Sequence, residues 1–241
     1  MSRETSYLSW EEDGPVGLLT LRRPERANAY HQPLLMELDA TLQGIRTREE
    51  IRVVVITGEG RHFCAGADLN ELATRSVEEV LSLFSQKVFN DLARLPRLTL
   101  AAIRGAAMAG GLELALACDL RMASEDARFG LPETKLGLIP AAGGTQRLPR
   151  LIGIPRAKEM ILAGRELGSE EALAWGLVTR LETGDTLLNA AMAWARQLAQ
   201  RDPLALQLAK SALDQSGISE QDLRIETLSQ ALLVARQRSG R

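Results

Sequence analysis

Hydrophobic residues along this chain recur with two periods, and the two periods predict alternating strands and helices. Residues 16–21 and 51–57 are short runs rich in aliphatic residues, and each is closed by a turn signal, Arg-Arg-Pro after the first and Gly-Glu-Gly after the second. We expect both to be strands. Residues 32–47 place leucine and isoleucine at spacings of three and four, which predicts a helix with one apolar face between the strands.

The same alternation continues to about residue 155 and then gives way to helices alone. A helical pattern over 77–95 is followed by a buried strand over 99–103, which Gly105 interrupts. Beyond residue 155 glycine becomes scarce, and the pattern predicts helices over 155–163, 169–175, 186–200, 203–214 and 220–236. Strands that alternate with helices favour an α/β protein, here with a helical C-terminal part.

Composition narrows the classes of partner and compartment. The 29 basic and 31 acidic residues give a formal charge of -2, so no overall attraction to nucleic acid or to an anionic membrane is expected. The longest apolar stretch, 98–120, is interrupted by Arg104, Glu113 and Asp119 and makes a poor membrane span. The N-terminal 14 residues are acidic and carry no apolar run, which argues against a secretory signal and favours the cytoplasm. The two cysteines are far apart, so neither a disulfide framework nor a metal site is predicted.

Two glycine-containing segments follow predicted strands and precede predicted helices. In the first, GEGRHFCAGADLNEL over 58–72, a helix is expected to begin near Ala67 or Asp68. In the second, GAAMAGGLELALAC over 105–118, Gly110 and Gly111 precede a compact leucine and alanine helix. The first turn of a helix has backbone N–H groups without intrahelical partners. Two such turns facing one another would aim a pair of donors at one oxygen, as in an oxyanion hole. A packing role is the commoner reason for such glycines.

Two carboxyl groups are candidates for proton transfer. Glu113 lies one turn into an otherwise apolar helix, where an unpaired charge is costly and the group needs a partner or a role. Glu133 lies in a turn bounded by proline and glycine within 129–148. Near an oxyanion hole, two such carboxyls could exchange protons with water and with the α-carbon of a thioester. The alternatives are an ion pair of Glu113 with an arginine and a solvated loop position for Glu133.

Four segments, taken in order, resemble the crotonase superfamily of enoyl-CoA hydratases and isomerases, and methylglutaconyl-CoA hydratase is also similar. They are RPERANA over 23–29, FCAGADL over 63–69, AGGLELALACD over 109–119, and residues 129–148. One departure is Ala109, which stands where a first glycine of three is frequent. The resemblance spans about residues 10–235.

The resemblance implies roles for individual residues. The backbone N–H groups of Ala67 and Gly110 would form the oxyanion hole, and Glu113 and Glu133 fall on the paired glutamates of hydratases. Isomerases of the family typically need only the glutamate matched by Glu133, so the pair favours hydration of a 2-enoyl-CoA to a 3-hydroxyacyl-CoA. Substrate contacts, mainly through the backbone, are expected from Ala27, Ala65, Asp68 and Leu69. No cofactor is expected, because coenzyme A is part of the acyl-CoA substrate.

The resemblance also implies the fold and the assembly. We expect a crotonase-like spiral of β-β-α units over 1–190, and a helical region over 191–241 that forms homotrimers or dimers of trimers. The C-terminal region is shorter than usual in the family, whose closing stretch often helps to cover the CoA site. Isomerase activity, a specialised methylglutaconyl-type or polyketide-type thioester, and a non-catalytic RNA-binding role are alternatives. The neutral charge counts against the last.

Overall fold

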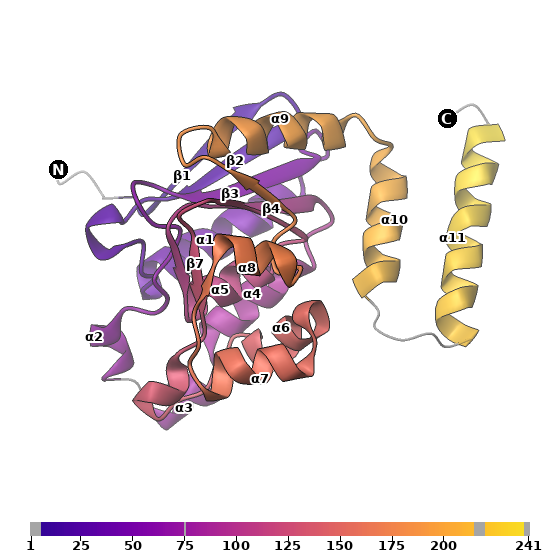
Figure 1. The fold of residues 1–241 in the computed structure, drawn as a ribbon. Coiled ribbons are helices and arrows are strands. Elements are labelled where there is room, and N and C mark those ends of the chain that lie inside the picture. The colour runs from indigo at the N-terminus through magenta and orange to yellow at the C-terminus, as the bar shows by residue number, and fades with distance from the viewer. Residues whose placement is uncertain (1–5, 75, 215–219, 239–241) are drawn as a thin grey trace.

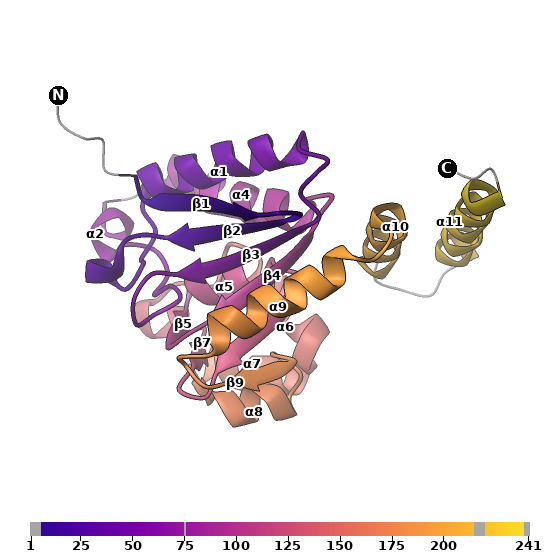
Figure 2. The ribbon, with the colours of Figure 1, turned by 90° about the horizontal axis from the view of Figure 1, so that it is seen from above.

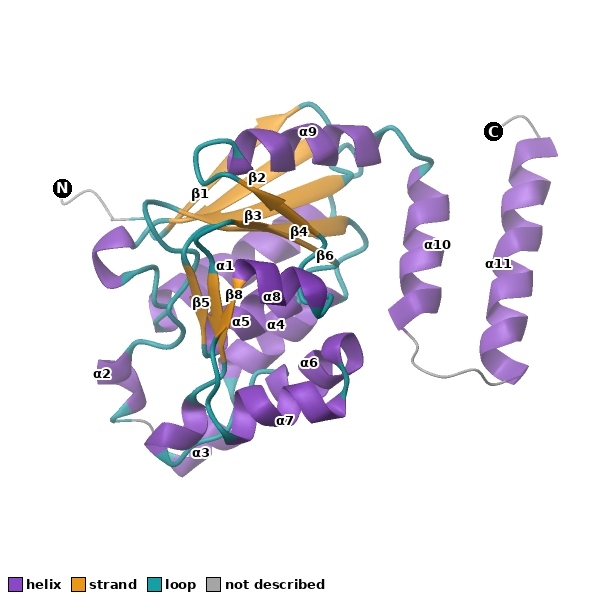
Figure 3. Ribbon diagram, viewed as in Figure 1, coloured by secondary structure: helices purple, strands orange, loops and turns teal. Residues whose placement is uncertain are grey.

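A large, mostly parallel sheet forms the layer on which the rest of the chain packs (Figures 1 and 3). The computed structural model describes residues 6–74, 76–214 and 220–238. In this part of the chain the sheet has the order β1-β2-β3-β4-β6-β9, in which only β1 runs antiparallel to its neighbour. Its strands are β1 Leu8–Asp13, β2 Val16–Leu21, β3 Val53–Gly58, β4 Leu98–Ile103, β6 Leu120–Ser124 and β9 Arg180–Glu182.

Both faces of this sheet are covered, as is usual for parallel strands. Alternate residues of β3 point to opposite sides: Val53 and Val55 belong to one apolar cluster, and Val54 and Ile56 to another. The first cluster packs against α9 (Leu187–Ala199), which lies across the sheet (Figure 2). The second contains the apolar residues of α1 (Gln32–Arg46), α4 (Phe84–Ala93) and α5 (Gly110–Leu116).

A smaller sheet lies beside the large one. It has the order β5-β7-β8, with bounds β5 Ala106–Met108, β7 Arg128–Gly130 and β8 Leu167–Gly168. The chain passes from β4 to β5 and then into α5, and it passes from β6 to β7 in the same way. An isolated bridge between Cys64 and Ala107 continues this pattern after β3. Each pass contributes one strand to each sheet, which is the arrangement of a spiral of β-β-α units.

Most predicted helices are present, and one is divided. The pattern over 77–95 forms two helices, α3 (Val77–Leu81) and α4, because the chain turns at Ser82 and Leu83 out of helical geometry. The turn lets α4 bury its apolar face while Val77 and Leu81 on α3 remain exposed. The other short helices and turns are η1 Pro24–Arg26, α2 Leu69–Leu72, η2 Glu133–Leu136, α6 Gly144–Ile152, α7 Ile154–Leu162 and α8 Ser169–Ala174.

The last two helices, α10 (Pro203–Asp214) and α11 (Glu220–Arg238), lie beside each other and project from the body of the molecule (Figures 1 and 2). The predicted boundary at residue 190 falls inside α9, which belongs to the layer on the large sheet. None of the helices in the described ranges is long and apolar enough to cross a membrane.

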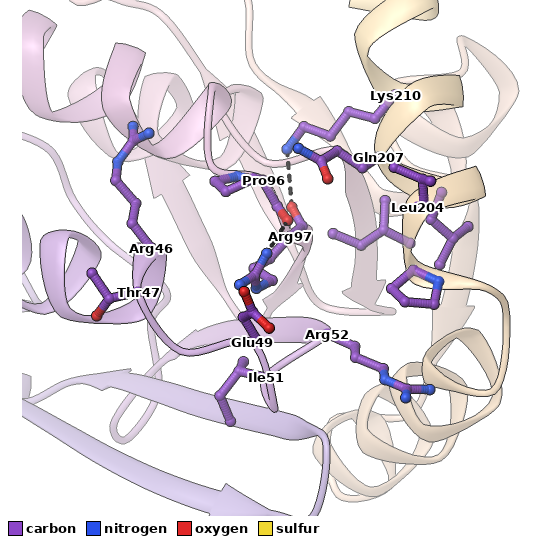
Figure 4. Close-up of a pocket in the computed structure, with 13 residues that line it drawn as sticks. Arg46, Thr47, Glu49, Ile51, Arg52, Pro96, Arg97, Leu204, Gln207 and Lys210 are labelled. Carbon is purple, nitrogen blue, oxygen red and sulfur yellow. Dashed lines mark hydrogen bonds between the residues drawn. The ribbon is translucent and has the colours of Figure 1, made fainter. Parts of the chain in front are cut away.

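Lysine 210 attaches α10 to the body. Its ammonium group donates to the carbonyl oxygens of Leu95 and Arg97 and pairs with Asp119 at 2.9 Å, and its side chain is 8% exposed. A cavity of about 430 Å³ lies beside this contact, between α10 and the loops that precede β3 and β4 (Figure 4). Most cationic side chains around it donate to backbone carbonyls, as Arg52 does to Ala199. The cavity thus belongs to the junction of α10 with the body.

Candidate active site

A second cavity, of about 490 Å³, brings together most of the residues predicted from the sequence. It lies among the segments that follow β3, β4 and β7, where the spiral places three loops side by side. Its lining includes Ala65, Ala67, Asp68, Leu69, Gly110, Glu113 and Glu133. Ala27 is not part of the lining, although its neighbour Arg26 is. Its carbonyl instead accepts a hydrogen bond from the backbone nitrogen of Ala65.

Two backbone N–H groups in this lining have no acceptor among the described residues. Tyr30 forms a parallel bridge with Ala67, in which Tyr30 donates to Gly66 and accepts from Asp68. The N–H of Ala67, which lies between those two residues, is therefore left out of the bridge. Gly110 is the first residue of α5, so its N–H has no partner within the helix. Both groups are available to an oxygen in the cavity.

Close packing between the two segments explains their glycines. Gly66 has a φ of 103°, and a Cβ added there would lie 3.2 Å from the nitrogen of Gly110. A Cβ at Gly111 would come within 2.0 Å of the carbonyl oxygen of Cys64, and one at Gly110 within 2.1 Å of the hydroxyl oxygen of Tyr30. These glycines therefore serve close packing, and the packing is what brings the N–H groups of Ala67 and Gly110 into one cavity.

Glu113 is buried and held in a fixed orientation. Its side chain projects from the first turn of α5, and Oε1 accepts hydrogen bonds from the backbone nitrogens of Ala142 at 2.7 Å and Gly144 at 2.8 Å. Burial raises the pKa of Glu113, while these two hydrogen bonds and the charge of Arg147 oppose the rise. Because Oε1 has both donors, Oε2 is the oxygen left for a group in the cavity.

The loop that holds Glu113 is itself held by side chains that the sequence did not single out. Arg147 on α6 donates to the carbonyl oxygen of Ala142 at 3.1 Å and to Oδ1 of Asn90 at 2.6 Å. Gln86 on α4 donates to the carbonyl oxygen of Ala141 at 2.7 Å. Asn90 and Gln86 lie four residues apart on one helix face, which is the only signal in the sequence that could have suggested a joint role.

The carboxyl of Glu133, unlike that of Glu113, has few hydrogen-bonding contacts. It begins the short turn η2, and its Oε2 is buried without a hydrogen-bond partner among the described residues. Burial raises the pKa of Glu133 to about 7, and the negative charge of Glu113 contributes to the rise. At neutral pH this carboxyl therefore exists in both protonation states, which suits a group that gives and takes protons.

One side of the cavity is built around Asp68. This residue caps α2 by accepting from the backbone nitrogen of Asn70 at 3.0 Å, and it pairs with Arg23 at 2.8 Å. Both interactions lower the pKa of Asp68. The buried Asn28 donates to the carbonyl oxygens of Glu59 and His62 and accepts from the nitrogen of Arg23. These contacts fix the 23–29 turn against the segment that carries Ala65 and Ala67.

The cysteines are not candidates for chemistry in the cavity. Cys64 and Cys118 are free and buried, and burial raises the pKa of each thiol to about 12, as expected for packing residues. Within the described ranges, no group of three or more histidine, cysteine, aspartate or glutamate side chains could hold a metal ion. The groups in the cavity that we consider as candidates for chemistry are the carboxyls of Glu113 and Glu133 and the backbone N–H groups of Ala67 and Gly110.

Comparison with known proteins identifies the family of the chain. The family model for enoyl-CoA hydratase/isomerase matches residues 11–238. The chain is 44% identical to the 2,3-dehydroadipyl-CoA hydratase of Escherichia coli (strain K12), over 83% of this chain and 79% of that protein. It is 42% identical to the mitochondrial methylglutaconyl-CoA hydratase of Mus musculus, over 85% and 68%.

Solved structures confirm the predicted fold class. The crystal structure of an enoyl-CoA hydratase from Bacillus anthracis superposes with a TM-score of 0.92 and 39% identity, covering 95% of this chain and 91% of the other. Relatives of this chain are hydratases, which are hydro-lyases. The chain belongs to the enoyl-CoA hydratase/isomerase family.

Proposed function

We propose that this protein is an enoyl-CoA hydratase that adds water across the double bond of a 2-enoyl-CoA and forms a 3-hydroxyacyl-CoA. The observation that supports this most is the presence of two carboxyls, Glu113 and Glu133, in one cavity with two backbone donors. One carboxyl would suffice to move a proton along an acyl chain. Hydration also requires a group that activates water, and the second carboxyl provides it.

In the proposed mechanism Glu113 is the base. Its Oε1 is fixed by Ala142 and Gly144, so Oε2 can accept a proton from a water molecule as that water attacks Cβ. The new C–O bond forms as the electrons of the double bond move toward Cα. The resulting enolate oxygen would accept hydrogen bonds from the N–H groups of Ala67 and Gly110, and each such donor is worth about 100- to 1,000-fold in rate.

Glu133 is the proposed acid. With a pKa of about 7, a large fraction of the enzyme carries the proton that Cα needs. Transfer to Cα completes the 3-hydroxyacyl product and leaves Glu133 ionised and Glu113 protonated. Exchange of protons with solvent then restores both groups. The reaction consumes one water and requires no redox or metal cofactor, and we propose that none is used.

The coenzyme A part of the substrate is proposed to lie along the 65–69 segment and Arg26, with Ala65, Asp68 and Leu69 as contacts. Ala27 would act by supporting Ala65 through its carbonyl.

We also propose that α10 and α11 mediate assembly into trimers or dimers of trimers. Their exposed leucines, Leu213, Leu228 and Leu232, support this proposal. We further propose a cytoplasmic location, which the sequence favours and which suits two buried cysteines without a disulfide.

Hydration is tested with purified protein and trans-2-hexenoyl-CoA, by following the loss of the conjugated thioester absorbance. Mass spectrometry should find a product heavier by one water. The isomerase alternative is tested with 3-hexenoyl-CoA, which would gain absorbance as 2-hexenoyl-CoA accumulates. If the folded protein raises the absorbance with 3-hexenoyl-CoA but does not hydrate the 2-enoyl thioester, the protein is an isomerase and not a hydratase. Conversion of neither substrate would contradict both.

A further inference from the structure

One part of the cavity lining is apolar. It is formed by α2, α3, the residue before α4, the end of η2 and the loop after η2, which contribute Leu72, Val80, Leu83, Leu136, Leu138 and Ile139. Several of these side chains are largely exposed along the rim, including Val80 at 51% and Ile139 at 67%. Apolar walls that continue to an open rim suit a hydrocarbon chain that runs outward from the reacting carbons.

The charged groups of the cavity are distributed unevenly. Among the described residues that line it, Arg26 is the only cation. Arg26 lies in η1, and its charge helps to lower the pKa of Asp68, which places it on the side assigned to coenzyme A. The acidic side chains of the described lining are Asp68, Glu113 and Glu133, whereas Glu71 and Glu79, on α2 and α3, line a neighbouring cavity.

Apart from Arg26, the described lining of the cavity offers no positive charge to an anion at the end of an acyl chain. Glu71 accepts hydrogen bonds from the backbone nitrogen of Gln32, and Glu79 accepts one from the backbone nitrogen of Ser76 as part of a capping box. Neither is paired with a cationic side chain in the part of the chain that the structure describes. An anion against the apolar walls would therefore have no cationic partner in the described lining, and the glutamates of the neighbouring cavity carry the same sign of charge.

We propose that the acyl group of the substrate is an unsubstituted hydrocarbon chain and that a carboxylate at its end is rejected. This inference rests on the proposed hydratase function and adds the chemical class of the acyl group. It separates this chain from the relative whose name specifies a dicarboxylic acyl group, 2,3-dehydroadipyl-CoA, despite 44% identity.

The expected discrimination is large because a carboxylate loses its hydration in such a site. An ionised carboxylate that moves from water to an apolar wall without a partner loses its hydration, and this cost exceeds the gain from any hydrocarbon contact that it makes. Discrimination by such an unpaired charge is about 100-fold or more in kcat/KM.

A matched pair of substrates tests the proposal directly. Trans-2-hexenoyl-CoA and 2,3-dehydroadipyl-CoA share a six-carbon chain and differ in whether it ends in a methyl group or a carboxylate. We expect kcat/KM for the first to exceed that for the second by about 100-fold or more. Equal values, or a preference for 2,3-dehydroadipyl-CoA, would overturn the proposal while supporting the hydratase function.

A charge added to the apolar wall should change this preference. Val80 lines the cavity, whereas the adjacent Leu81, 83% exposed, does not. Val80→Arg should raise the ratio of kcat/KM for 2,3-dehydroadipyl-CoA over hexenoyl-CoA by about tenfold or more, and Leu81→Arg, which adds the same charge to the same helix, should leave the ratio unchanged. Equal effects of both variants would mean that Val80 does not face the acyl end, and would overturn the placement of the chain.

Binding of saturated analogues separates this inference from hydration. Hexanoyl-CoA and adipoyl-CoA cannot be hydrated, and calorimetry measures their dissociation constants. We expect hexanoyl-CoA to bind at least about tenfold more tightly. If the protein hydrates nothing but retains this difference, the proposed function fails and the specificity of the cavity stands. Equal binding of the two thioesters would contradict the proposed specificity whatever the hydration assay gives.

Discussion

The backbone nitrogen of Gly144 lies 2.8 Å from Oε1 of Glu113, so a carboxyl on one helix is oriented by the first residue of another. A second donor, the nitrogen of Ala142, lies 2.7 Å from the same oxygen. Both are backbone groups that can only donate, which fixes Oε1 as an acceptor. The orientation of Glu113 is therefore independent of its protonation state.

This relationship predicts that Glu113→Gln leaves the fold intact and stops water activation. The amide oxygen can accept both backbone donors, so the side chain keeps its position, but the NH2 group in place of Oε2 cannot take a proton. We expect kcat for hydration of hexenoyl-CoA to fall by about 100-fold or more with KM little changed. Wild-type circular dichroism and melting temperature would show that the fold is intact. A kcat within tenfold of wild type would exclude Glu113 as the base.

Glu133 should produce a pH dependence in both activity and stability. If it is the acid, kcat/KM should fall as pH rises through about 7, and Glu133→Gln should remove this limb together with most of the activity. The folded pKa is above the unfolded value of about 4.3, so the folded state holds more protons between these values. Stability contributed by Glu133 is thus present below about pH 4 and lost as pH rises toward 7.

The effect of Glu133 on the pH dependence of stability can be measured without substrate. Relative to wild type, Glu133→Gln should raise the melting temperature more at pH 8 than at pH 5, because it removes a carboxyl that is costly to ionise in its folded environment. Glu170→Gln, at an exposed position on α8, is the matched control and should give no such difference. The same melting shift at both pH values would show that the pKa of Glu133 is not raised by folding.

Periodicity was sufficient for the parts of the fold that bury a regular apolar face. The strands β2, β3 and β4 and the helices α1 and α7 to α11 lie within a few residues of their predicted bounds. The strand β6 was missed because its sequence, Leu-Arg-Met-Ala-Ser, has no β-branched residue and includes Arg121. That arginine is 5% exposed and donates to the carbonyl oxygens of Leu177 and Cys118. Backbone carbonyls that solvate a buried charge are not visible in a local pattern.

Most of the residues named from the sequence and the family resemblance line one cavity, although Ala27 does not, but the groups that support them were not predicted. Glu113 stood out as a charge in an apolar helix, whereas Glu133 was indistinguishable from a solvated loop residue without the family resemblance. The donors at Ala142 and Gly144 are backbone groups, so no side-chain pattern could reveal them. Arg147 supports this loop through a contact with Asn90, 57 residues earlier in the chain. Such contacts depend on the tertiary fold and lie beyond the reach of periodicity.

Ala109 offers a test of backbone strain at the site. It precedes α5 with φ 50° and ψ −128°, a conformation that glycine adopts readily and alanine does not. Ala109→Gly should therefore stabilise the protein by about 1 kcal/mol, even though glycine costs more entropy on folding. Ala193→Gly, at an exposed position inside α9, should instead destabilise by about 0.5 to 1 kcal/mol. Urea denaturation measures both, and a loss of stability in Ala109→Gly would contradict the assignment of strain.

Arg147 should act on catalysis through Glu113. It supports the loop that holds Glu113, and its charge lowers the pKa of that carboxyl. Arg147→Met should shift the acidic limb of kcat/KM to higher pH and reduce kcat by about tenfold as the loop loosens. Arg150→Met, at an exposed position on the same helix, is the control. A reduced kcat with an unmoved acidic limb would show that Arg147 is only structural.

Lys210 should determine how firmly α10 is held to the body. Its ammonium group is mostly buried between two carbonyl oxygens and Asp119, whose Oδ2 also accepts from the backbone nitrogen and hydroxyl of Thr99. Lys210→Met leaves Asp119 without its cation and should destabilise the protein by about 2 kcal/mol or more, with faster proteolysis between α9 and α10.

A double-mutant cycle with Asp119 tests the role of Lys210. Adding Asp119→Asn to Lys210→Met should recover part of the loss, because the second change removes the orphaned charge, and the double-mutant cycle should give a coupling of about 1 kcal/mol or more. Lys158→Met, at an exposed position on α7, should change neither urea midpoint nor cleavage rate. Additive losses for Lys210 and Asp119 would show that the ion pair does not hold α10.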